Sequence, residues 1–75
     1  MFLFRSKAVR ELDAIIAELQ ANLENNYKDT AQAAREKLGR RLEELRSEGK
    51  LSDKLYKKYF VVYNEYCVKM TGYKH

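Results

Sequence analysis

The chain has 75 residues, a net charge of +4 and 35% charged residues. A chain of this length forms one domain at most, here residues 1–75, and buries too little surface for a wide margin of stability. Cys67 is the only cysteine and His75 the only histidine, which excludes an internal disulfide and leaves no metal site to expect. Association with another chain is the remaining way to compensate for the small core.

The composition favours an all-α domain without a membrane span. There is no proline, there are three glycines, and charged residues are interspersed with alanine and leucine. No apolar stretch approaches the roughly 20 residues that span a bilayer, and the apolar N-terminus (MFLF) is too short for a signal peptide. We expect a cytoplasmic protein in which Cys67 stays reduced.

The first predicted helix covers about residues 6–25. Ser6 is a good N-cap residue. Apolar residues then recur every three or four positions, which places them on one face. They are Ala8, Val9, Leu12, Ile15, Ile16, Leu19 and Leu23.

The second predicted helix covers about residues 30–48. Asn25 and Asn26 tolerate the left-handed backbone that ends helices. We expect Asp29 to cap the next helix, with Gln32 completing a capping box. The apolar stripe is narrow and coiled-coil-like. It consists of Ala31, Ala34, Leu38, Leu42 and Leu45, with Tyr27 on the same line.

A single long helix is the alternative to this helical hairpin. The spacing also runs unbroken through Leu23, Tyr27, Ala31 and Ala34, so residues 6–48 can be read as one helix. Together with a C-terminal helix, it would need oligomerisation to complete a core. We favour the hairpin because Asn-Asn followed by an aspartate cap is a specific end-and-start signal.

The third predicted helix covers about residues 53–71. Gly49 suits the left-handed position after the second helix, and Ser52 is the next N-cap. Leu51 and Tyr56 have the spacing of a hydrophobic staple. Gly72 follows the last helical residue and is expected to end the helix.

Within this helix, the segment YFVVYNEYCV has the composition of a strand, but its apolar run does not alternate. On a helix the apolar residues span an arc of about 160°, which is wide enough to cover the hairpin. We therefore assign them to the core in preference to a base-stacking surface. They are Leu55, Tyr56, Tyr59, Phe60, Val62, Tyr63, Tyr66, Cys67 and Met70.

These elements predict a small three-helix bundle, an antiparallel hairpin with the third helix packed across it. Phe2 and Phe4 are expected to cover one open end. The predicted seam pairs Leu12, Ile16, Leu19 and Leu23 with Leu38, Leu42 and Leu45, and Tyr59, Tyr63, Tyr66 and Met70 close the core.

Two valines do not fit this core. Val61 and Val68 stand seven residues apart near the middle of the opposite face of the third helix, with Lys57 and Asn64 beside them. Isolated exposed valines are common and need no explanation. A second contact is the other interpretation, and the small core favours it. We predict a non-enzymatic interaction module that forms a homo-oligomer, with a dimer favoured, or binds a protein partner through these four residues.

A nucleic-acid-binding or accessory protein is the weaker alternative. It would use Arg40, Arg41, Lys54, Lys57 and Lys58, but glutamates interleave with the basic residues and dilute the field. Contact of the MFLF segment with a membrane surface is weaker still, because such anchoring needs a longer amphipathic face.

Catalysis has little support in the sequence. There is no nucleophile elbow and no phosphate-binding glycine loop, and no base stands near Cys67 in the sequence. We therefore predict no catalytic residue, no cofactor and no small-molecule substrate.

Overall fold

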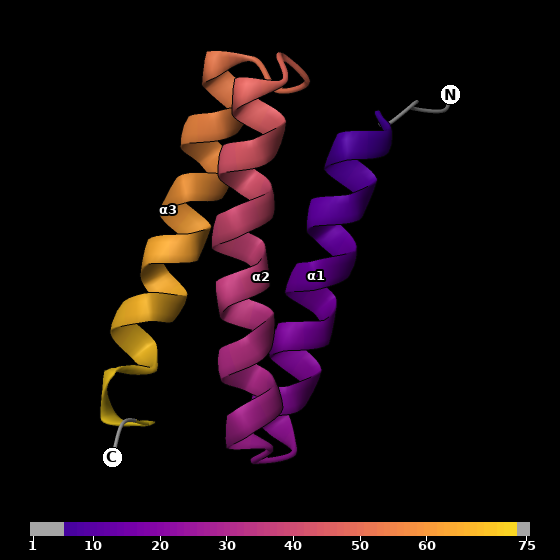
Figure 1. Ribbon diagram of the computed structural model, residues 1–75. Helices are drawn as coiled ribbons and strands as arrows, with labels where there is room; N and C mark the ends of the chain where they lie inside the picture. The colour runs from indigo at the N-terminus through magenta and orange to yellow at the C-terminus, as the bar shows by residue number, and fades with distance from the viewer. Residues whose placement is uncertain (1–5, 74–75) are drawn as a thin grey trace.

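The computed structural model describes residues 6–73, which form an all-α three-helix bundle. The elements are α1 (Lys7–Glu24), α2 (Lys28–Ser47), α3 (Asp53–Lys69) and a short 3₁₀ turn, η1 (Thr71–Tyr73). Consecutive helices run antiparallel, and α2 packs against both α1 and α3 (Figure 1). The predicted hairpin is confirmed, and the single helix over residues 6–48 is not formed. Phe2 and Phe4 lie outside the described residues.

Side-chain caps begin the first and third helices as predicted. The backbone N–H of Val9 donates to Oγ of Ser6 at 3.1 Å, and that of Leu55 donates to Oγ of Ser52 at 3.2 Å. Each hydroxyl satisfies one of the N–H groups that a helix start leaves without a partner. Gly49, in the loop before α3, has a φ of 76°, the left-handed conformation expected of it.

The start of α2 differs from the prediction. Its N-cap is Tyr27, no side chain caps it, and Asp29 lies within the first turn. The reversal is completed earlier than expected because Asn26 alone takes the left-handed conformation, with a φ of 60°. The carbonyl of Tyr27 then accepts from the N–H of Ala31 at 2.9 Å and from the hydroxyl of Thr30 at 3.2 Å. Asp29 still suits the first turn, where the helix dipole favours a negative charge.

Tyr27 itself does not extend the apolar stripe of α2, because 60% of its surface is exposed. The end of α3 also differs. The helix stops at Lys69, the buried Met70 is its C-cap, and Gly72 belongs to η1. The hydroxyl of Thr71 donates to the carbonyl of Val68 and so satisfies a backbone group at the end of the helix.

The core lies mainly between α1 and α2. Its most deeply buried large side chains are Leu12, Leu19, Leu38 and Leu42. Ile15 is buried, whereas the predicted seam residues Ile16 and Leu23 are half-buried and pack against the core from its edge. The small Ala31 and Ala34 are also buried, which allows close approach of the two helices near the turn.

Tyrosine hydroxyls attach α3 to its neighbours. Tyr59 is buried, and its hydroxyl donates to Asp13 of α1 at 2.7 Å. The hydroxyl of the half-buried Tyr66 donates to Gln20, also of α1, at 2.7 Å. Each ring adds apolar area to the core while its hydroxyl finds a polar partner at the edge.

A glycine in α2 accommodates another tyrosine of α3. A Cβ atom placed on Gly39 would lie 2.8 Å from Cε1 and 2.9 Å from Cζ of Tyr63. These distances are shorter than a normal carbon–carbon contact. The missing side chain of Gly39 therefore makes room for the ring of Tyr63 against α2.

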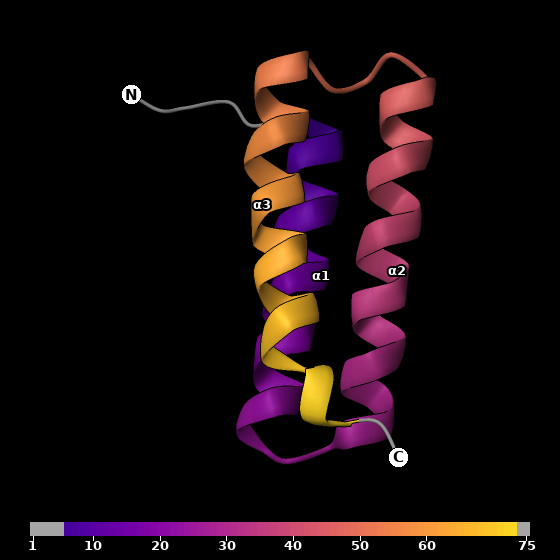
Figure 2. The ribbon, with the colours of Figure 1, turned by 90° about the vertical axis from the view of Figure 1, so that its left-hand side faces the viewer.

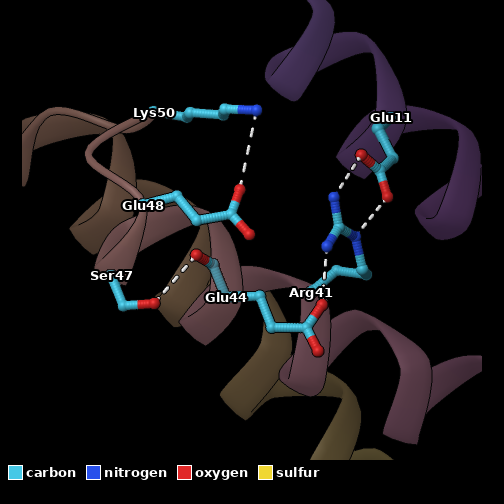
Figure 3. Close-up of polar contacts among 6 residues, drawn as sticks. All are labelled: Glu11, Arg41, Glu44, Ser47, Glu48 and Lys50. Carbon is cyan, nitrogen blue, oxygen red and sulfur yellow. Dashed lines mark hydrogen bonds and ion pairs between the residues drawn. The ribbon is translucent and has the colours of Figure 1, made fainter.

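An ion-pair cluster joins α1 to α2 (Figure 3). The guanidinium of Arg41 donates twice to Glu11, with the Nη2–Oε1 bond at 2.9 Å, and once to Glu44 at 2.6 Å. The hydrogen bond from Arg41 holds the pKa of Glu11 below its ordinary value. The two carboxylates in turn raise the pKa of Arg41.

We predict that the effect of Gly39→Ala depends on Tyr63. Alanine in an unobstructed helix interior is more stable than glycine by about 1 kcal/mol. With Tyr63 present, displacement of the ring offsets this gain, and the free energy of unfolding does not rise. In a Tyr63→Ala background it rises by about 1 kcal/mol. Urea denaturation of the four proteins measures the coupling, and an equal rise in both backgrounds would show that the ring does not oppose a Cβ.

We also predict that Glu11→Gln lowers stability in a pH-dependent way. The folded pKa of Glu11 is depressed, so the ion pair contributes fully above the ordinary value of 4.5. Its contribution is lost as the pH falls through the depressed value. Thermal melts should therefore show a lower midpoint than wild type at pH 7, and the difference between the two proteins should shrink progressively as the pH falls below 4.5. Glu18→Gln, at an exposed glutamate of the same helix, is the matched control. A deficit that does not change as the pH is lowered would contradict the ion-pair interpretation.

Candidate functional site

The outer face of α3 carries an exposed apolar stripe. Val61 is 54% exposed and Val68 is 75% exposed. Lys57 and Asn64 are exposed as well, and the spacing of these four residues is four, three and four. Such spacing follows one line along a helix, as the contact positions of a coiled coil do. We call Lys57, Val61, Asn64 and Val68 the outer stripe.

No other element of the described chain lies over this face. In Figure 1 α3 forms one side of the bundle, and Figure 2 shows the same helix nearest the viewer along its length. A partner helix therefore has access to the whole stripe without rearrangement of the bundle.

Phe60, which was predicted to lie in the core, is a further exposed apolar residue beside the outer stripe. It is 38% exposed, with its ring centroid 5.7 Å from that of Tyr56 and 6.3 Å from that of Tyr63. These two tyrosines occupy the side of α3 nearer α2. The sequence indicated this exposure only through the position of Phe60 at the rim of the apolar arc, about 100° from Tyr59.

Charge is unevenly distributed along this face. Lys54, Lys57 and Lys58 are exposed beside Asp53 in the N-terminal half of α3, whereas the C-terminal half exposes Glu65 and Lys69. The ammonium of Lys58 lies 5.5 Å from the ring centroid of Tyr59. The N-terminal half of α3 therefore has a net positive charge, whereas the exposed charges of the C-terminal half balance.

The residues proposed for nucleic-acid binding do not share one surface. Arg41 is engaged with Glu11 of α1 and Glu44, as described above. Arg40 is exposed and lies with two glutamates, Glu36 and Glu43, along a groove of about 270 Å³ between α2 and α3. The exposed lysines of α3 remain as the basic surface, so the structure adds no support to this alternative.

Cys67 lies at the edge of a small cavity of about 180 Å³ between α2 and α3. Nη1 of Arg35 donates to its sulfur at 3.7 Å. A hydrogen bond with Cys67, together with burial, raises the pKa of Tyr63. The cavity is lined by Gln32, Arg35, Cys67, Met70 and Thr71. Among the described residues, this lining holds neither a carboxylate nor an imidazole that could act as a general base beside the thiol.

The described part of the chain contains neither a candidate metal site nor a candidate membrane span. Over residues 6–73, no three His, Cys, Asp or Glu side chains are grouped closely enough to hold a metal ion. Within the same part of the chain, no helix has both the length and the apolar character to cross a membrane.

The arrangement that remains is an exposed, partly apolar helix face with an asymmetric charge distribution. Comparisons of the chain with models of protein families, with curated proteins and with solved structures gave no match.

Proposed function

We propose that the chain is a non-enzymatic interaction module that self-associates through the outer stripe of α3. The observation that carries this proposal is the exposure of Val61 and Val68 in one line on a helix whose opposite face packs in the core. Single exposed valines occur on many proteins. Here the two share a stripe and have the exposed Phe60 beside them.

The small core supplies the driving force for such a contact. Tyr59 is the one residue of α3 that is buried, so this helix contributes little fully buried area in the isolated chain. Each Å² of apolar surface removed from water contributes about 25 cal/mol. A second chain on the outer face would make α3 an element that is buried on both sides.

The stripe is short, and this sets the class of interface. Two valines and a flanking phenylalanine bury less area than the standard protein interface of about 1,600 Å². We therefore expect a weak, reversible dimer, with the lysines at its rim contributing selectivity rather than most of the affinity.

Val61→Glu and Val68→Glu test this proposal. Each places a carboxylate in a contact that would exclude water, so each should raise the dissociation constant at least tenfold, about 1.4 kcal/mol. Light scattering on a sizing column over a range of concentrations, with reductant present, measures association. Circular dichroism should show unchanged helicity.

Ala33→Glu is the matched control, because it adds the same charge at an exposed position of α2. It should associate as wild type does. A wild-type protein that stays monomeric at the highest concentration would overturn self-association, whereas valine variants that associate normally would show that the contact lies outside the outer stripe. Loss of helicity in these variants would show that the valines support the fold of the single chain instead.

A further inference from the structure

We propose that the helix that covers the outer stripe is α3 of a second copy of the chain, running antiparallel, with the two-fold axis passing between Val61 and Asn64. This inference rests on the self-association proposed above and specifies the partner and its orientation. Spacing, charge and the edges of the stripe each favour it.

The spacing of the stripe allows a reversed partner to interlock. With the two-fold axis between Val61 and Asn64, each Val61 packs against the partner's Asn64. Each Val68 packs against the aliphatic stem of the partner's Lys57, whose ammonium reaches solvent. Both valines are exposed in the single chain, so each gains a contact.

Charge selects the antiparallel orientation over the parallel one. A parallel pair sets Lys54 and Lys57 against the same residues of the partner, and like charges in one layer repel. Its one compensating contact is Asp53 with the partner's Lys58. An antiparallel pair spreads the lysines over the opposite ends and aligns the two helix dipoles favourably.

The two edges of the antiparallel interface are also complementary. On one edge, Lys58 lies alongside the partner's Glu65, and symmetry repeats this pair. On the other edge, the exposed Phe60 meets the partner's Cys67, which is half-buried in the single chain, and this extends the apolar contact beyond the valines. The surface is self-complementary, so the assembly closes at two chains and does not grow into a filament.

A charge exchange between Lys58 and Glu65 tests the orientation. Lys58→Glu and Glu65→Lys each convert the attractive edge into a repulsive one, so each should weaken dimerisation about tenfold at low salt. The double variant, Lys58→Glu with Glu65→Lys, again places opposite charges side by side at this edge and should recover the wild-type dissociation constant. Sedimentation equilibrium at low salt measures all four proteins.

Lys69→Glu is the control for the charge change itself. Lys69 is an exposed lysine of the same helix whose ammonium also lies 5.5 Å from a tyrosine ring centroid, that of Tyr66, and it follows Val68, the last residue of the outer stripe. Its substitution should change the dissociation constant much less than Lys58→Glu does.

The outcomes separate this inference from the proposed function. Recovery in the double variant supports the antiparallel pair. A dimer that Val61→Glu disrupts but that the double variant does not restore would overturn the orientation and leave self-association standing. A wild-type protein without a dimer would overturn both.

Disulfide trapping gives an independent readout of orientation in a Cys67→Ser background. In the antiparallel pair, two Val68→Cys chains hold their cysteines about 16 Å apart along the helix axis, too far for a disulfide. A mixture of Val68→Cys and Lys57→Cys chains should instead form mixed disulfides. Efficient trapping of Val68→Cys with itself would show a parallel pair and overturn the proposal.

Discussion

The leucine seam between α1 and α2 is the contact on which the rest of this structure depends. Leu12 and Leu19 from one helix and Leu38 and Leu42 from the other have almost no exposed surface. They are the largest fully buried side chains of the described residues, and their removal from water stabilises the hairpin. Because the seam joins neighbours in sequence through a tight turn, it closes at a small entropic cost. It creates the surface on which the third helix packs.

The third helix is attached in a different way. Tyrosine rings supply its apolar contact, and the hydroxyls of Tyr59 and Tyr66 reach polar side chains of α1. Gly39 leaves room for a further ring against α2. An element held by amphipathic side chains can remain partly wet at its edges. This explains how α3 joins the bundle with one buried residue and still presents valines on its other side.

Some basic residues form ion pairs between the helices, and others remain exposed to solvent. Arg41 joins α1 to α2 through carboxylates on both helices, whereas Lys54, Lys57 and Lys58 stay exposed on α3. Among the described residues, Arg41 therefore serves the contact between α1 and α2, and the lysines of α3 contribute positive charge to the surface. The asymmetry along α3 has a further consequence, because the position of Glu65 relative to the lysines distinguishes the two directions in which another helix can pack.

Local features of the sequence were sufficient to predict the three helices, the serine caps and the outward direction of Val61 and Val68. Periodicity over three and four residues places a side chain on a helix face, and a cap hydrogen bond spans only three residues, so both are readable from neighbours in the chain. The failed prediction of Asp29 as a cap was also local. There a left-handed Asn26 completed the turn sooner than the capping pattern indicated.

Only the tertiary structure decided which residues at the edges of these faces are covered. The exposure of Phe60, the burial of Ile15 ahead of Ile16, the fit of Tyr63 against Gly39 and the pairing of Arg41 with Glu11 all depend on how the helices are rotated about their axes. That rotation is set by contacts between residues far apart in the sequence. Helical periodicity determines which residues share a face, but packing against the neighbouring helices determines how much of that face is buried.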